Sequence, residues 1–336
     1  GDHRDLHKEY RRQRQMCIRD RTKGLKEALD KDPSVFIMGE DIGPYGGAYA
    51  VTKGFLDEYG AERIKDTPIA ESVMVGAGTG AAMGGMKPVV ELMTINFGLL
   101  AMDQIVNHAA KIRYMSGGQF SVPLIIRAVT GGGGGLAATH SQCLEGWFAS
   151  VPGLKVATPA TPYDALGLLR SSFEDNNPIL FAEHALIYGV KGEVPEDYYT
   201  VPFGKAETVI EGSSVSLIAY SRMVHVATEA AAELAKDGIS CEVIDIKTLR
   251  PFDIESVADS VRKTNRAVVV EEAWKTGGFG AEIASQIQEV AFEDLDGPIL
   301  RICGEEVPQP YNKKLEAMSI PDAAKVVSSV KRHFSL

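Results

Sequence analysis

The chain has 336 residues, of which 45% are hydrophobic and 24% charged, ordinary proportions for a globular protein. At about 150 residues per domain, this length predicts two domains. The formal net charge of −10 disfavours nucleic acid as the main partner, and no apolar run approaches the roughly 18 residues that a membrane span requires.

The cysteines are few and far apart, at positions Cys17, Cys143, Cys241 and Cys303. None belongs to a CxxC pair, so the sequence indicates neither a zinc site nor a disulfide framework. This pattern fits a reducing compartment, and we expect the protein in a bacterial cytoplasm or an organelle matrix.

The first 23 residues are unlike the rest of the chain. They are rich in Arg and Lys, have no apolar periodicity and lack the apolar core of a signal peptide. We therefore expect residues 1–23 to form an atypical arm, disordered or not native to the protein, and we place no function on it.

From residue 25 onward, short apolar runs alternate with amphipathic stretches. The first unit, residues 24–188, is predicted to contain strands at 34–38, 87–93, 122–127 and 178–181, and helices after residue 71 and at 97–114 and 163–173. This alternation predicts a parallel sheet with helices on both faces. Residues 189–210 are polar, contain Pro195 and Pro202, and are typical of a linker.

Residues 211–336 show the same alternation and predict a second α/β domain. Strands are expected at 214–220, 241–246, 267–271 and 298–302, with helices at 225–236, 254–262 and 280–290. Gly238 lies just past the first of these helices, as a helix stop should. The predicted fold class is therefore α/β, with two domains that are each a mostly parallel sheet flanked by helices.

The segment TPIAESVMVGAGTGAAMGG, residues 67–85, places a single carboxylate at the start of a predicted helix of small and apolar residues. This residue is Glu71, and no other charge follows it until Lys87. Glu71 is therefore expected to be partly buried, which favours the protonated form of a carboxyl and suits proton handling. The alternative is a capping acid on a glycine-rich core helix.

The glycines of this helix recur every four residues, at Gly76, Gly80 and Gly84, and so share one face. Each costs about 1 kcal/mol relative to alanine, which is tolerated where another backbone or a ligand comes close. The run also matches the loose dinucleotide pattern GxGxxG. We reject that interpretation, because these glycines lie inside a helix rather than in a strand-to-helix turn.

A run of five glycines, residues 131–135, precedes the sequence ATHSQ at 138–142. Thr139 and Gln142 have capping-box spacing, which predicts His140 in the first turn of a helix, where the helix dipole disfavours imidazolium. His140 is thus a candidate acid, base or hydrogen-bond partner for a substrate. The alternative is a surface or capping histidine.

Seven segments in order carry a resemblance to a known family: TPIAE (67–71), ELMTINF (91–97), MSGGQ (115–119), ATHSQ (138–142), DNNP (175–178), EVIDIKTLRPFD (242–253) and VVEEAWKTGGFGAEI (269–283). Together they resemble the beta subunits of thiamine-diphosphate-dependent 2-oxo acid dehydrogenases, and within that family the pyruvate dehydrogenase decarboxylating component. The resemblance implies a transketolase-like pyrimidine-binding domain followed by a transketolase C-terminal-like domain.

The resemblance also implies roles for individual residues. Glu71 matches the glutamate that hydrogen-bonds the aminopyrimidine ring of thiamine diphosphate and promotes its activation. Phe97 matches the aromatic residue that packs on the pyrimidine, and His140 matches the histidine that faces the substrate. A structural potassium loop is implied at five further positions, Leu124, Ser172, Phe173, Asp175 and Asn177; by itself, the DNNP segment is simply a turn before a strand.

The chain contains no GDG sequence, the motif that holds the diphosphate-binding magnesium in enzymes of this kind. The resemblance therefore implies an alpha subunit that brings magnesium and the diphosphate side, in an alpha2-beta2 heterotetramer. The second domain is expected to serve assembly and docking to the dihydrolipoyl acyltransferase core. The glycine face of the helix after residue 71 is then a candidate for close packing at a subunit interface.

The function implied is the oxidative decarboxylation of pyruvate on thiamine diphosphate, with transfer of the acetyl group to lipoamide. Branched-chain 2-oxo acid and acetoin dehydrogenases share the same motifs and remain alternatives. A non-catalytic scaffold subunit is a further hypothesis. A self-sufficient transketolase-like enzyme is disfavoured by the missing GDG.

Overall fold

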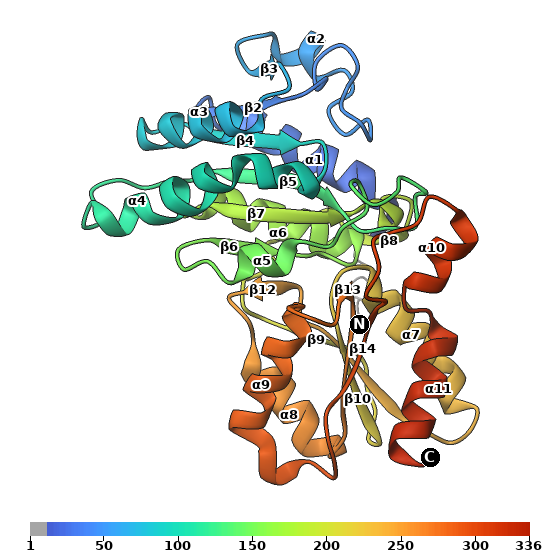
Figure 1. Cartoon of the computed structure of the whole chain (residues 1–336). Coiled ribbons are helices and arrows are strands. Elements are labelled where there is room, and N and C mark those ends of the chain that lie inside the picture. The colour runs from blue at the N-terminus through green and yellow to red at the C-terminus, as the bar shows by residue number, and fades with distance from the viewer. Residues whose placement is uncertain (1–11) are drawn as a thin grey trace, which may run out of the picture.

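Two β-sheets, one in the upper and one in the lower half of Figure 1, organise the chain. The structure is a computed structural model that describes residues 12–336, with side chains described from Arg19 onward. Both sheets are mostly parallel and flanked by helices, so the predicted fold class is confirmed.

The first sheet has seven strands in the order β12-β6-β7-β5-β4-β2-β3. All neighbouring strands are parallel except β12, which runs antiparallel to β6. The strands are β2 (Val35–Gly39), β3 (Ile64–Asp66), β4 (Lys87–Leu92), β5 (Ile125–Thr130), β6 (Lys155–Ala157), β7 (Ile179–His184) and β12 (Thr248–Arg250).

The helices of this first domain lie on both faces of the sheet (Figure 1). They are α1 (Cys17–Lys31), α2 (Phe55–Tyr59), α3 (Glu71–Met83), α4 (Ala110–Met115), α5 (Glu145–Ala149) and α6 (Pro162–Glu174), with shorter turns η1 (Ile95–Ala101), η2 (Gln104–Ala109) and η3 (Ala185–Ile187).

The second sheet has five strands in the order β14-β13-β10-β11-β9, with β9 alone antiparallel to its neighbour. The strands are β9 (Glu207–Ile210), β10 (Val215–Ala219), β11 (Cys241–Asp245), β13 (Ala267–Trp274) and β14 (Leu300–Gly304). Helices α7 (Arg222–Ala235) and α11 (Ala323–Phe334) pack together on one side, and α8 (Ile254–Thr264) and α9 (Phe279–Ala291) on the other. Turn η4 (Phe292–Asp294) and helix α10 (Lys313–Ser319) complete the domain.

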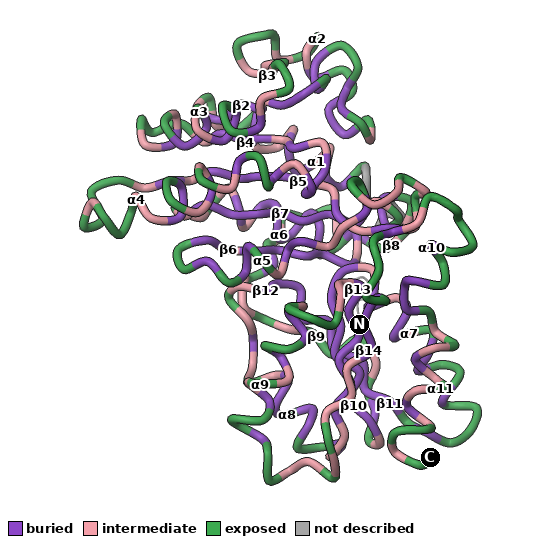
Figure 2. The backbone as a smooth tube through the Cα atoms, viewed as in Figure 1, coloured by how far each residue is buried: buried purple, intermediate pink, exposed green. Residues whose placement is uncertain are grey.

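The central strands form the cores of both domains. Every residue of β7, β10 and β11 is buried, and Figure 2 shows the buried chain concentrated along the strands. Parallel strands covered on both faces need apolar side chains on both sides, which gives continuous apolar runs rather than alternation. Such runs made these strands recognisable in the sequence.

The segment β12 joins the two domains. The chain leaves the second sheet after β11 and returns to the edge of the first, where Thr248 pairs with Ala157 and Arg250 with Val156. The N–H of Thr158 also donates to the carbonyl of Lys247 over 2.8 Å. Residues that follow the second sheet's β11 therefore complete the first sheet.

The N-terminal prediction differs from the structure. Residues 1–11 lie outside the described residues, but residues 12–23 form β1 (Arg12–Met16) and the start of α1 rather than an arm without structure. Strand β1 pairs antiparallel with β8 (Lys191–Pro195), and Arg21 is fully buried in an ion pair with Glu183. Strand β1 is polar and is held by backbone pairing, so no apolar pattern in the sequence predicts it. Strands β8 and β9 also occupy part of the expected linker, 189–210.

The helix expected at 97–114 is divided into three pieces of different winding. A 3-10 turn at η1 is followed by a π-helical turn at η2 and then by α4. Such irregular turns are common at functional sites. Here η1 positions Phe97, and Gly98 lies against the Phe148 ring, so that a Cβ on Gly98 would come within 3.2 Å of it.

Among the described residues, no helix combines the length and apolar character that crossing a membrane would require.

Candidate active site

Glu71 is the first residue of α3 and is only 3% exposed. The rest of the buried side of this helix consists of Met74, Val75, Gly78, Thr79 and Ala82. The backbone thus carries a carboxyl group into an apolar environment, as the sequence predicts. Its position at a helix N-terminus also places it near unpaired backbone N–H groups.

A second carboxyl group, Glu40, lies beside Glu71. Glu40 follows β2 directly and is 8% exposed. Burial raises the pKa of Glu40, and the neighbouring Glu71 raises it further. A like-charged neighbour in a buried site favours the protonated form of Glu40.

Glu40 was not predicted as a site residue from the sequence. A signal was present, because Glu40 stands at the carboxyl end of a strand in a parallel sheet, where ligands of such sheets bind. The buried Oε1 of Glu40 has no hydrogen-bond partner among the described residues. A buried polar atom without a partner is costly, so this atom points to a ligand group that donates a hydrogen bond.

Phe97 and His140 are brought together by the fold. Their ring centroids are 5.2 Å apart with an interplanar angle of 88°, an edge-to-face contact. Phe97 is half-buried on η1, whereas His140 is exposed. Its Nδ1 lies 2.9 Å from the hydroxyl of Thr139, and no described residue bonds its Nε2.

His140 does not lie in a helix, contrary to the capping-box prediction. Residues 131–144 form an irregular loop, and α5 begins only at Glu145. Ala137 has a positive φ of 66°, and the N–H of His140 donates to its carbonyl in a turn. The helix-dipole argument for a neutral His140 therefore does not apply.

Gln142 and Asn96 fix the loop to η1, a contact between residues 46 positions apart that the sequence did not predict. The Oδ1 of Asn96 accepts hydrogen bonds from the backbone N–H of Gln142 at 3.3 Å and from its Nε2 at 2.8 Å. Asn96 is itself buried and donates to Thr94 Oγ1. The residue next to Phe97 thus anchors the loop that carries His140.

The connections that carry the candidate residues leave the same edge of the sheet. Glu40, Glu71, Phe97 and His140 follow β2, β3, β4 and β5, which are mutually parallel neighbours. The carboxyl ends of such strands share one edge. Helix α3 also packs against η1, which brings the Glu71 and Phe97 segments together.

A buried ion cluster connects the strands near this edge. Arg127 on β5 donates to Glu183 Oε2 at 2.6 Å and to Glu91 Oε2 at 2.5 Å. Although burial opposes it, Arg127 and Arg21 hold the pKa of Glu183 below its usual range, while burial raises the pKa of Glu91. Since these charges satisfy one another, we assign the cluster a structural role.

The proposed potassium residues lie at the ends of neighbouring elements, with Leu124 just before β5, Ser172 and Phe173 at the end of α6, and Asp175 and Asn177 in the turn before β7. Asp175 Oδ1 accepts from the backbone N–H and Nδ2 of Asn177 at 2.8 and 2.7 Å, and Lys155 is ion-paired with the other oxygen. Both oxygens of the Asp175 carboxylate thus already have partners within the chain. Among the described residues, no three or more His, Cys, Asp or Glu side chains could together hold a metal ion.

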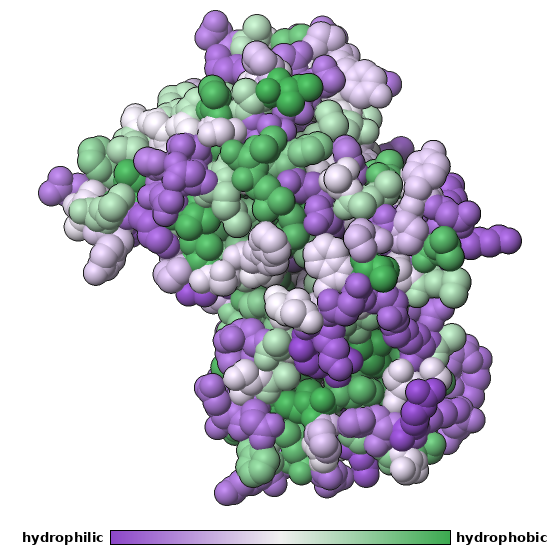
Figure 3. Space-filling view, viewed as in Figure 1, coloured by the Kyte–Doolittle hydropathy of each residue, from purple (hydrophilic) through white to green (hydrophobic). Residues whose placement is uncertain are grey.

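Of the three glycines, Gly76 faces η2, where a Cβ would lie 3.2 Å from Gln104 Oε1, whereas Gly80 and Gly84 face no other element of the chain. A Cβ on Gly80 would meet nothing within 4 Å, and one on Gly84 would meet only carbonyls of α3 itself. Figure 3 shows hydrophobic residues (green) at the surface of this domain. The exposed large hydrophobic side chains on or next to α3, η1 and α4 include Ile69, Val73, Leu100, Tyr114 and Met115. Contiguous exposed apolar surface marks a site of association.

Two family models match the chain. The transketolase pyrimidine binding domain matches residues 21–190, and the transketolase C-terminal domain matches residues 204–326. Among solved structures, a split-gene transketolase described as an inactive beta4 tetramer matches with a TM-score of 0.76 and 23% identity, over 96% of this chain and 98% of that one. At that identity the likeness concerns the fold alone.

Closer relatives carry the name pyruvate dehydrogenase E1 component subunit beta. The protein of Gracilaria tenuistipitata var. liui is 48% identical over 311 residues, covering 91% of this chain and 96% of its own length. The mitochondrial protein of Bos taurus is 44% identical over 328 residues, covering 96% of this chain and 91% of its own length.

Proposed function

This chain belongs to the family of beta subunits of the pyruvate dehydrogenase E1 component, and from that membership we propose that it acts with an alpha subunit in the oxidative decarboxylation of pyruvate, with transfer of the acetyl group to lipoamide. The observation that carries the proposal is the buried pair of carboxyls, Glu71 and Glu40, in the domain that matches the pyrimidine-binding model.

The residues at this edge fit the pyrimidine half of thiamine diphosphate. Glu71 would hold the ring nitrogen, and Glu40 would hold a proton beside it, since its pKa is raised. The unpartnered Oε1 of Glu40 supplies an acceptor for a donor on the ligand. When bound, the cofactor supplies the carbanion stabilisation that decarboxylation needs.

The two aromatic residues complete this half-site. Phe97 offers an apolar ring against which a pyrimidine can pack. The Nε2 of exposed His140 is available to donate to or accept from a substrate oxygen, while Thr139 at Nδ1 orients the ring. The chain thereby contributes proton-handling and positioning groups.

The diphosphate side of the site is proposed to come from an alpha subunit, which would also hold magnesium. The absence of GDG from the sequence supports this division. The open surface at Gly80 and Gly84 of α3 and the exposed apolar side chains beside it support a partner at this surface, in an alpha2-beta2 assembly. The C-terminal domain is proposed to dock to the dihydrolipoyl acyltransferase core.

A bacterial cytoplasm or an organelle matrix is the proposed location, since several relatives are named as mitochondrial. Potassium at Leu124, Ser172, Phe173, Asp175 and Asn177 remains a prediction. Backbone carbonyls would have to supply most of its ligands, because Lys155 and Asn177 already engage the Asp175 carboxylate.

The test uses the reconstituted alpha–beta pair. Glu71→Gln should lower the rate of pyruvate decarboxylation by roughly 100-fold or more, because a positioned proton-transfer group contributes that much. Glu62→Gln, at a carboxylate whose side chain is 99% exposed, is the matched control. Wild-type activity in Glu71→Gln would favour a non-catalytic scaffold subunit.

Substrate choice is tested with the same pair. Pyruvate should be turned over faster than 3-methyl-2-oxobutanoate or acetoin. Equal or faster turnover of either competitor would assign the chain to the branched-chain or acetoin enzymes instead.

A further inference from the structure

The glycine run at 131–135 is held by carboxylates of the other domain. Gly131, Gly133 and Gly135 have positive φ values of 88°, 87° and 71°, and the intervening glycines do not. Alternating backbone conformations of this kind turn backbone N–H groups toward an anion. Two carboxylates take that place here, Glu272 on β13 and Glu316 on α10.

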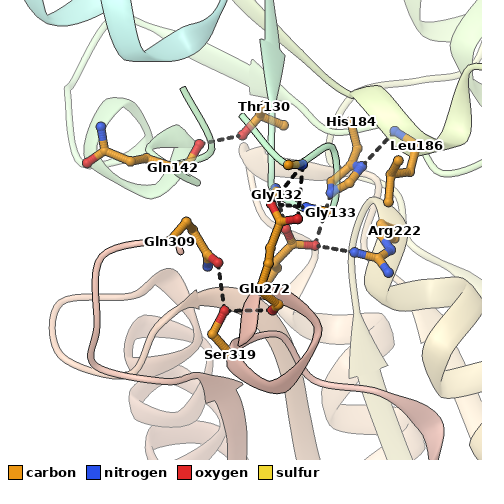
Figure 4. A network of polar contacts seen from close by, with 12 residues as sticks. Thr130, Gly132, Gly133, Gln142, His184, Leu186, Arg222, Glu272, Gln309 and Ser319 are labelled. Atoms are coloured by element: carbon orange, nitrogen blue, oxygen red, sulfur yellow. Dashed lines mark hydrogen bonds and ion pairs between the residues drawn. The ribbon is translucent and has the colours of Figure 1, made fainter. Parts of the chain in front are cut away.

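Each carboxylate bonds a different part of the run (Figure 4). Glu272 Oε1 accepts from the N–H of Gly132 at 2.7 Å. Glu316 Oε1 accepts from Gly133 at 2.9 Å, and its Oε2 accepts from Gly135 at 3.0 Å. Both side chains are buried, Glu316 to 1% exposure and Glu272 to 7%.

Glu272 is itself fixed from two sides. Its Oε2 lies 3.0 Å from His184 Nε2 and 3.4 Å from Arg222 Nη1. Although burial opposes it, His184 and Arg222 hold the pKa of Glu272 at about 2, so its carboxylate stays ionised at neutral pH. His184 also fills the space over Gly131, where a Cβ would lie 2.1 Å from its Nε2.

Glu316 is braced by its own helix end. Ser319 Oγ lies 2.7 Å from both the backbone carbonyl oxygen of Glu316 and Gln309 Oε1, and its single O–H can donate to either. Figure 4 shows Gln309 and Ser319 below the glycine loop, on the side of the C-terminal domain. The two residues whose carboxylates accept hydrogen bonds from the glycine loop are therefore themselves held by neighbouring residues.

The loop is tethered at two points with His140 between them. The glycine run is tethered to Glu272 and Glu316, and Gln142 is tethered to Asn96. Between the tethers, the contacts of His140 with other described residues are the turn to Ala137, the contact with Thr139 and the ring contact with Phe97. Loss of one tether would leave His140 held from one side.

We propose that Glu272 and Glu316 are positioning residues of the C-terminal domain that set the place of His140 in the active site through the glycine loop. This inference rests on the proposed function, because it takes His140 to face the substrate. The C-terminal domain then contributes to the chemistry of the first domain as well as to assembly.

The test compares Glu316→Ala and Glu316→Gln with the control Glu305→Ala in the reconstituted alpha–beta pair. Glu305 is a half-exposed carboxylate that pairs with Lys325 and does not bond the loop. Hydrogen–deuterium exchange of residues 131–140 and the kcat and KM for pyruvate are measured, with kcat normalised to folded, assembled enzyme.

Glu316→Ala is expected to raise amide exchange in residues 131–140 by about 10-fold to 100-fold, the equivalent of losing bonds to a charged acceptor. We expect kcat to fall by about 10-fold, while Glu305→Ala changes neither amide exchange nor kcat. Glu316→Gln, which keeps the side-chain volume and one acceptor oxygen, is expected to lie between the two. If Glu316→Ala does not fold, Glu316→Gln decides by the same measurements.

Unchanged exchange in the loop, or raised exchange with unchanged kcat, would overturn the proposal. A wild-type pair that does not decarboxylate pyruvate would instead defeat the proposed function. The exchange measurement would still report whether Glu316 holds the loop, so the two failures are distinguishable.

Discussion

Replacing Gly80 by alanine should stabilise the isolated chain and weaken its assembly with a partner. Gly80 lies in the interior of α3, and the new methyl group would meet no atom of the chain within 4 Å. Alanine in place of glycine at such a position gains roughly 0.5–1 kcal/mol of unfolding free energy. At a closely packed subunit interface, the same methyl would cost about 1–3 kcal/mol.

Gly78→Ala is the matched comparison on the same helix. A Cβ there would lie 2.8 Å from Val90 Cγ2 and 3.1 Å from Leu124 Cδ1, so overpacking should offset the helix-propensity gain and destabilise the isolated chain. Urea unfolding of the chain expressed alone measures the first effect. Titration with the alpha subunit in the ultracentrifuge measures the second, and Gly80→Ala should weaken it by about tenfold or more. Assembly of Gly80→Ala at wild-type affinity would refute the interface assignment.

Three further predictions concern buried groups of the first domain. Burial raises the pKa of Glu145 to about 7, so its contribution to the unfolding free energy should be complete below pH 4.5 and should be lost as pH rises through 7. The unfolding free energy of Glu145→Gln, measured with urea, should therefore depend less on pH over this range than that of the wild type. An equal pH dependence in the two proteins would contradict this prediction. Arg127→Met should lower the unfolding free energy by about 3–5 kcal/mol, because Glu91 loses its ion-pair partner and Glu183 keeps only Arg21 of its two buried arginines; a loss below about 1 kcal/mol would argue against the ion cluster as a structural element. Asn96→Ala should lower kcat by about tenfold, because Gln142 loses both bonds to it, and steady-state kinetics that match the wild type would remove Asn96 from the site.

Local patterns predicted much of the fold. The strands β10, β11 and β13 and the helices α6, α8 and α9 lie close to their expected positions, because buried parallel strands are continuous apolar runs and their helices are amphipathic. Glu71 was recognised because a lone carboxylate in an apolar helix is conspicuous. In these cases the deciding interactions act along a few consecutive residues.

The missed features depend on partners that are distant in sequence. Strand β1 is polar and exists by pairing with β8, which follows it by well over a hundred residues. Glu40 belongs to the site because the fold brings it to Glu71. The roles of Glu272 and Glu316 depend on a loop that precedes them by more than 130 residues, which no spacing pattern could indicate.

The short strand β12 makes the edge of the first sheet depend on residues that follow β11 of the second sheet. Its removal would leave β6 as an open edge, with the backbone N–H and C=O groups that pair with Thr248 and Arg250 unpaired. Open edges of this kind template strand addition by other chains. A fragment cut between the domains should therefore be prone to aggregate. During synthesis, the first sheet can gain its last strand only after the chain has been made beyond residue 250.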